Sequence, residues 1–178
     1  MEFAKVLERV ATFLEARGVR FGIVGAVALH AYGLTRATSD LDFVVEEKGR
    51  ADLIRFLESL GYESLNVSEG YSNHVHPLAS LGRLDFVYVD ERTATILFES
   101  ARSLDVLPGH TALVPRPEHL AAMKVLAMKN DPARTFQEMS DIRYLLTLPG
   151  IDQQEIRGHF VKHGLESRFD EIKKTIAE

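Results

Sequence analysis

Two aspartates stand two residues apart where an apolar segment begins. Residues 35–45 read T-R-A-T-S-D-L-D-F-V-V, so Asp40 and Asp42 open a stretch that is otherwise typical of a buried β-strand. Successive side chains of a strand point to opposite faces, so the two carboxylates share one face while Leu41 and Phe43 turn to the core. Two neighbouring carboxylates repel each other unless a cation offsets their charge. The pair is therefore a candidate half-site for one or two divalent cations.

A third carboxylate follows on a second strand pattern, R-L-D-F-V-Y-V at residues 83–89. Its alternation puts Asp85 on an otherwise apolar face, which is unfavourable unless Asp85 joins a charged group. An isolated D-x-D has a simpler explanation, a turn at Asp40 and a solvated Asp42. If the two strands are neighbours, however, Asp85 completes a three-carboxylate site. Mg²⁺ or Mn²⁺ held there would share its shell with substrate phosphates, and a two-metal site can activate a nucleophile and stabilise a leaving phosphate.

A glycine turn precedes the acid pair in the sequence. In V-G-A (24–26), Gly25 joins a short strand pattern to a helical one. Glycine allows a tight bend and a close approach of the backbone to a ligand, and the first N–H groups of a helix suit phosphate. Such a turn also occurs for packing alone. Together with three acids, it predicts a site for nucleotide transfer.

Hydrophobic periodicity and turn residues outline the elements that must position these groups. In the first part of the chain they predict helices at 3–16, 26–32, 49–60 and 92–102, and strands at 20–25, 41–45, 62–67, 72–78, 83–89 and 111–114. After Pro115 and Pro117 they predict helices at 118–129, 134–147, 152–163 and 165–177. We expect an α+β core over 1–116 and a helical region over 117–178, which packs on the core as a second domain or as part of a single one.

Composition excludes several other classes of protein. The 178 residues are 46% hydrophobic and 26% charged, with a net charge of -5, so no overall basic field favours nucleic acid, although a local basic patch stays open. The absence of cysteine excludes disulfides, thiolate metal sites and a cysteine nucleophile. The N-terminus has the pattern of an amphipathic helix rather than of a signal or transit peptide, and no run is long enough to span a bilayer. We expect a soluble cytoplasmic protein without a membrane partner.

The motifs together resemble a known family. The segment V-G-A-V-A-L-H-A-Y-G-L-T-R-A-T-S-D-L-D-F, with the later L-D-F, is similar to the nucleotidyltransferase superfamily of the DNA polymerase β type. The longer sequence pattern G-x-x-A-L-x-x-x-G-x-x-R-x-T-x-D-L-D is most similar to the minimal bacterial branch that includes AbiEii-like toxin nucleotidyltransferases. The segment H-L-A-A-M-K-V-L-A-M-K…E-M-S-D-I-R-Y-L-L resembles the helical region of that branch. The resemblance covers roughly residues 20–148 and implies a mixed β-sheet flanked by helices, with a C-terminal helical bundle.

The resemblance also implies roles for individual residues. Asp40 and Asp42 would hold the metal ions, and Asp85 would complete the metal site and help to activate the attacking group. Residues implied in nucleotide binding are Gly25, Ala26, Arg36, Ser39, Lys124 and Asp141. Ala26 stands where the family usually has serine or a second glycine, so a side-chain hydrogen bond to phosphate is lost while the backbone donor remains.

For several of these residues, a purely structural role without nucleotide contact also stays open. Arg36 fits a loop salt bridge as well as a triphosphate contact, and Ser39 fits a plain turn. Lys124 fits a surface position, and Asp141 fits a packing or solvent-facing one.

The predicted function is a metal-dependent transfer of a nucleoside monophosphate from a nucleoside triphosphate, ATP among the candidates, to a hydroxyl acceptor. The acceptor is open between RNA, a protein and a small molecule. The alternative is a catalytically weak or inactive protein of the same fold that binds a nucleotide or a partner. A component of a toxin–antitoxin pair is an example, with an antitoxin as its partner.

Overall fold

Five of the apolar strand patterns pair into one mixed β-sheet. The computed structural model describes residues 2–177, and contacts between Cα atoms divide the chain into two units, Met1–Pro115 and Arg116–Glu178. The first unit contains helices α1 (Phe3–Glu15), α2 (Gly25–Ala31), α3 (Arg50–Ser59) and α4 (Glu91–Glu99), and a 3₁₀ turn, η1 (Glu47–Gly49). Its strands are β1 (Phe21–Ile23), β2 (Asp40–Glu46), β3 (Glu63–Val67), β4 (Tyr71–Val75), β5 (Arg83–Val89), β6 (Arg102–Leu107) and β7 (His110–Val114).

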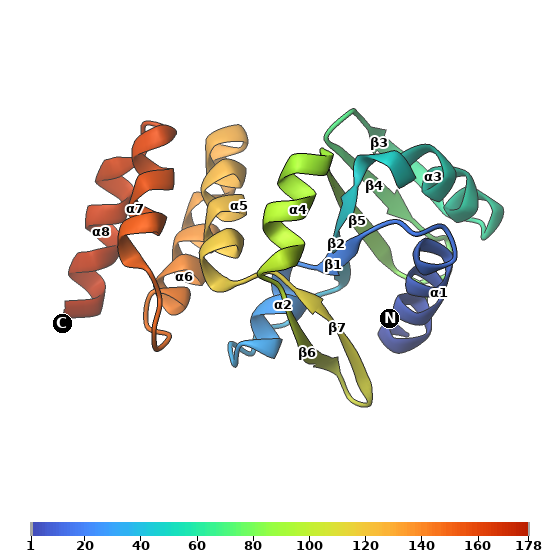
Figure 1. Cartoon of the computed structure of the whole chain (residues 1–178), viewed down its shortest axis with the longest axis horizontal. Coiled ribbons are helices and arrows are strands. Elements are labelled where there is room, and N and C mark those ends of the chain that lie inside the picture. The colour runs from blue at the N-terminus through green and yellow to red at the C-terminus, as the bar shows by residue number, and fades with distance from the viewer. Residues whose placement is uncertain (1, 178) are drawn as a thin grey trace. The chain divides into compact units, whose positions relative to one another are not determined.

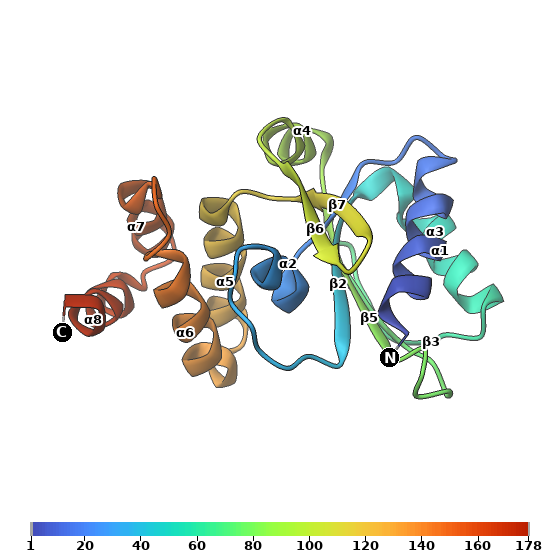
Figure 2. The ribbon, with the colours of Figure 1, turned by 90° about the horizontal axis from the view of Figure 1, so that it is seen from below.

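The sheet has the strand order β1-β2-β5-β4-β3, and Figure 1 labels the elements. The central pair β2–β5 is parallel, and the other pairs are antiparallel. Helices α1 and α3 lie on one side of the sheet, and α2 and α4 lie on the other (Figure 2). The predicted α+β fold with a mixed sheet is thus confirmed.

The apolar positions of β2 and β5 form the core beneath the acidic ones. In the parallel register, Leu41 pairs with Leu84 and Phe43 with Phe86. All four side chains are buried, and the two phenylalanine rings stack with their centroids 5.1 Å apart. Because residues alternate between faces, this packing turns the aspartates of both strands to the opposite face.

The hairpin β6–β7 differs from the sequence prediction. The helix expected at 92–102 ends at Glu99, and residues 102–107 form β6, which pairs antiparallel with β7. The hydroxyl of Ser100 donates to the carbonyl of Ile96 at 3.0 Å, which satisfies a carbonyl of the last helical turn. Gly109, with a φ of +76°, forms the turn between the two strands. The prediction extended the helix over a segment that belongs to this hairpin.

The second unit is helical. It contains α5 (Pro117–Asn130), a 3₁₀ turn η2 (Pro132–Arg134), α6 (Thr135–Leu145), α7 (Gln153–Lys162) and α8 (Glu166–Ala177). The core of this unit includes the fully buried Ile142, Leu145 and Phe160. None of the helices described in the two units is both long and apolar enough to cross a membrane.

Candidate metal and nucleotide site

Strands β2 and β5 bring three carboxylates together. Asp42 and Asp85 are direct partners in the parallel register, and Asp40 precedes Asp42 by two residues on the same face. One carboxylate oxygen from each of the three lies within 4.8 Å of the others, and all three residues are half-buried. The condition set by the sequence, that the two strands are neighbours, is met.

Gly25 lies directly against this cluster. The N–H of Val24 donates to the carbonyl oxygen of Asp42 at 3.0 Å, which holds the start of α2 beside β2. Gly25 has a φ of +62°, and a Cβ atom there would lie 1.9 Å from Oδ2 of Asp42 and 2.5 Å from its Cγ. Only glycine leaves room for the carboxylate in this position. The glycine turn and the acid pair are therefore one structural unit.

Two side chains hold the third carboxylate. Asn73 on β4 donates from Nδ2 to Oδ1 of Asp85 at 2.9 Å, and Arg83 on β5 donates from Nε to the same oxygen, also at 2.9 Å. The hydrogen bond to Asp85, together with the negative charges of all three aspartates, raises the pKa of Arg83 although burial opposes this. Asp85 is thus fixed through Oδ1.

The loop between α2 and β2 is anchored at both ends. His30 places Nε2 2.7 Å from the carbonyl oxygen of Arg36, and the hydroxyl of Thr38 donates to Oδ1 of Asp40. Ser39 is exposed immediately before the cluster, and Arg36 is half-buried. Their contacts with a triphosphate stay predictions.

Ala26 lies in the first turn of α2 and is 2% exposed. Its side chain is therefore buried. A contact of this residue with a nucleotide, which stays a prediction, would have to come from the backbone.

Lys124 and Asp141 pair with each other in the second unit. The Nζ atom of Lys124 lies 2.6 Å from Oδ2 of Asp141 and 2.8 Å from Oε2 of Glu138, and all three side chains are buried. Gln137 donates to Oδ1 of Asp141 at 3.0 Å. The lysine is therefore not at the surface but joins α5 to α6. Contact of Lys124 or Asp141 with a nucleotide stays a prediction.

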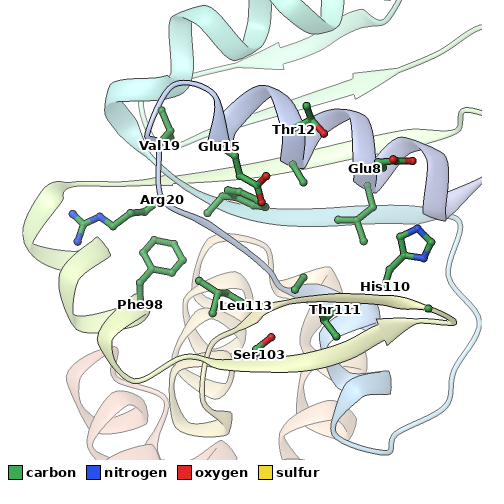
Figure 3. Close-up of a pocket in the computed structure, with 15 residues that line it drawn as sticks. Glu8, Thr12, Glu15, Val19, Arg20, Phe98, Ser103, His110, Thr111 and Leu113 are labelled. Carbon is green, nitrogen blue, oxygen red and sulfur yellow. The ribbon is translucent and has the colours of Figure 1, made fainter.

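A separate hollow lies between α1 and the strand β7 (Figure 3). Its volume is about 700 Å³, and its lining includes Glu8, Glu15, His110 and Leu113. Of the described residues that line it, none belongs to the acidic cluster or to the turn at Gly25. The hollow is therefore not part of the candidate metal site.

Sequence reasoning missed several residues that support the acids. Arg83 precedes Asp85 by two residues in a strand, and the alternation alone puts both side chains on one face. The sequence could therefore have indicated that Arg83 lies beside Asp85. Thr38 lies just before the acid pair in the quoted motif, and only its hydrogen bond to Asp40 went unpredicted. Asn73 gave no signal, because its position opposite Asp85 depends on the register between β4 and β5.

The donor set fits a hard divalent cation. Carboxylate oxygens are the ligands that Mg²⁺ and Mn²⁺ prefer, whereas softer metals select thiolate or imidazole. The close approach of Gly25 to Asp42 leaves backbone rather than a side chain beside the cluster. The three aspartates could thus hold such a cation next to the turn at which α2 begins.

Comparison with known proteins identifies the fold. No protein-family model matches the sequence, and no curated protein matches it significantly. A structure of the antibiotic-resistance factor ANT(2'')-Ia aligns over 99% of both chains at 14% identity, with a TM-score of 0.67. The same protein in complex with adenylyl-2''-tobramycin aligns over 99% of both chains at 12% identity, with a TM-score of 0.56.

A third structure, the lincosamide antibiotic adenylyltransferase LnuA with bound lincomycin, aligns over 80% of this chain and 96% of that chain. The identity is 16% and the TM-score is 0.57. The chain is similar to these proteins in fold, and that fold is the nucleotidyltransferase fold that the motifs predicted. The resemblance to the AbiEii-like branch stays a prediction.

Proposed function

We propose that this chain, which has the nucleotidyltransferase fold, transfers a nucleoside monophosphate from a nucleoside triphosphate to a hydroxyl group, with Mg²⁺ or Mn²⁺ bound at its acidic cluster. One observation carries the proposal. Asp40, Asp42 and Asp85 converge from two strands at the point where Gly25 starts a helix. The dependence on nucleoside triphosphate makes the cytoplasm the expected location.

The reaction is a displacement at the α-phosphorus. The acceptor oxygen forms a bond to the α-phosphorus, the bond from that phosphorus to the bridging oxygen breaks, and pyrophosphate leaves. The hydroxyl proton passes to the carboxylate of Asp85, which Asn73 holds in place through Oδ1. Bound Mg²⁺ or Mn²⁺ would neutralise the phosphate charge that grows as pyrophosphate leaves.

The chain's own groups orient the nucleotide. The backbone at Gly25 and Ala26 would donate to the phosphates, since the first N–H groups of a helix have no acceptor within the helix. Arg36 and Ser39, on the loop that leads into Asp40, would lie along the triphosphate. Fixed carboxylates and backbone donors need little rearrangement during the reaction, which is the main electrostatic advantage of such a site.

A small molecule is the acceptor that we favour. On the face that carries Asp85, Val87 is 40% exposed and Tyr71, its partner on β4, is 49% exposed, so an acceptor can approach the cluster across β5 and β4. The net charge of -5 offers little overall attraction to RNA. ANT(2'')-Ia is an antibiotic-resistance factor and LnuA is an antibiotic adenylyltransferase, which agrees with this choice.

The test uses each α-³²P-labelled nucleoside triphosphate with Mg²⁺ or Mn²⁺. The acceptors are a panel of aminoglycosides and other hydroxylated small molecules, total RNA, and lysate protein. Wild type is compared with Asp42→Asn, which keeps the side-chain shape and removes the charge. We expect label in a small-molecule acceptor with wild type and a loss of at least about 10²-fold with the variant.

Each other outcome has a defined meaning. Label in RNA or protein keeps the transferase and corrects the acceptor. Nucleotide binding without transfer to any acceptor supports the binding-protein alternative, including a partner such as an antitoxin. Release of orthophosphate without transfer identifies a hydrolase.

A further inference from the structure

A positively charged side chain lies within the acidic cluster. Arg83 is the register partner of Asp40 across β2 and β5, and its Nε donates to Oδ1 of Asp85 at 2.9 Å. Its side chain is 46% exposed, whereas that of Asp85 is 20% exposed. Three carboxylates and one guanidinium carry a net charge of -2, so the cluster is partly neutralised before any cation binds.

We propose that Arg83 is a counter-ion that competes with the divalent cation for Asp85, so that the cation binds weakly until a nucleoside triphosphate is present. This inference rests on the proposed function, because it concerns the same site. It gives Arg83 a role in the order of binding rather than in the transfer step.

The hydrogen bonds of Asp85 make the competition specific. A carboxylate oxygen has two lone pairs, and Oδ1 already accepts from Asn73 and Arg83. Asp85 can therefore bind a cation through Oδ2 alone, with the guanidinium still close to its other oxygen. The positive charge of Arg83 then opposes the cation directly.

A triphosphate relieves this competition. Guanidinium groups pair well with phosphate oxygens, so the triphosphate offers Arg83 a second anionic partner. Its half-exposed, flexible side chain can turn from Asp85 without breaking the core. The triphosphate also supplies oxygen ligands to the cation. Cation and nucleotide therefore bind cooperatively, and the empty enzyme holds little metal.

Three variants separate charge from positioning. Arg83→Gln removes the positive charge and keeps an amide donor. Arg83→Lys keeps the charge. Asn73→Ala removes the other donor to the same oxygen of Asp85 without changing the charge of any group, so it reports positioning alone.

The experiment measures Mn²⁺ binding to the full chain by calorimetry and electron paramagnetic resonance, with and without a non-hydrolysable nucleoside triphosphate analogue. Without nucleotide, we expect Arg83→Gln to bind Mn²⁺ about three- to tenfold more tightly than wild type. The effect is no larger because solvent screens the charge of the half-exposed Arg83 side chain. Arg83→Lys should match wild type, and Asn73→Ala should bind no more tightly. With the analogue, the difference between Arg83→Gln and wild type should shrink.

Equal or weaker Mn²⁺ binding by Arg83→Gln, in a protein that unfolds at the wild-type temperature, overturns the inference. If wild type and Arg83→Gln then both bind Mn²⁺ with the analogue, and Asp42→Asn does not, the proposed metal site stands and only the role of Arg83 is wrong. If no form binds Mn²⁺ even with the analogue, the proposed function fails as well.

Discussion

At the scale of single residues, the site depends on an absent side chain. Gly25 combines a φ of +62° with contact to Asp42 so close that a Cβ would lie 1.9 Å from its carboxylate oxygen. The backbone conformation and the space thus require glycine independently. The glycine turn and the acid pair are separate motifs in the sequence, and in the structure Gly25 lies directly against Asp42.

Gly25→Ala should therefore abolish the proposed transfer. The new methyl group must displace the carboxylate of Asp42, and a misplacement of about 1 Å costs on the order of 10²-fold in rate. Gly18→Ala is the matched control, because Gly18 has a φ of +61° and a Cβ added there would meet nothing within 4 Å. Both variants should lose about 1–2 kcal/mol of unfolding free energy through the backbone strain.

Transfer assays, Mn²⁺ titration and urea unfolding of the two glycine variants separate the contributions. We expect Gly18→Ala to keep its activity and Mn²⁺ affinity and Gly25→Ala to lose both. Equal activity in the two variants would mean that the position of Asp42 does not limit the reaction.

At the scale of elements, an ion pair ties the end of β2 to its neighbours. Arg20, just before β1, donates to both carboxylate oxygens of Glu46 at 3.0 and 3.2 Å, and to the hydroxyl of Thr95 on α4 at 2.9 Å. Lys48 lies 3.0 Å from the same carboxylate. The hydrogen bond from Arg20 contributes most to lowering the pKa of Glu46 from 4.5 to about 2.

This pair predicts a pH dependence of stability. Because the pKa of Glu46 is lower in the folded protein, its stabilisation is complete above about pH 4.5 and is lost as the pH falls toward 2. We expect Glu46→Gln to cost about 1–3 kcal/mol at pH 7, reduced from the full linkage value because Arg20 and Lys48 are partly exposed. The cost should shrink as the pH falls below 4.5.

Urea unfolding at pH 7, 4 and 3 measures this effect. Glu47→Gln, at an exposed neighbouring position, is the control and should follow wild type. A cost of Glu46→Gln that stays constant over the three pH values would show that the ion pair is not the source of the acid sensitivity.

The buried ion cluster of the second unit predicts a larger effect. Lys124→Met leaves Glu138 and Asp141 buried without their lysine, and breaking a buried pair in this way costs about 3–5 kcal/mol. Lys129→Met, at an exposed position of the same helix, should change the unfolding free energy by less than about 0.5 kcal/mol. Similar unfolding curves for both variants would show that the cluster does not join α5 to α6.

At the scale of the whole molecule, local patterns predicted more than long-range ones. The alternation at 83–89 matches β5 in full, and the acids of β2 share a face as the strand period requires. The same period could have indicated the proximity of Arg83 to Asp85. By contrast, the parallel pairing of β2 with β5 was only a condition of the prediction, since register between distant strands depends on packing.

Other features depended on long-range contacts that the sequence does not display. Asn73 contacts Asp85 only because β4 pairs with β5 in one register. Strand β6 was not predicted, because the helical pattern of the sequence continues past Glu99, where the helix ends in the structure. The burial of Lys124 depends on two acids 14 and 17 residues further along the chain, of which only Asp141 was singled out.

The most direct measurement of the central claim follows both products of one reaction. Wild type and Asp42→Asn are incubated with the nucleoside triphosphate, Mn²⁺ and the small-molecule acceptor panel, and mass spectrometry and a pyrophosphate assay are applied to the same samples. We predict an acceptor heavier by one nucleoside monophosphate and an equal amount of pyrophosphate, both absent with Asp42→Asn. Orthophosphate in place of pyrophosphate, or equal product from the variant, would contradict the account.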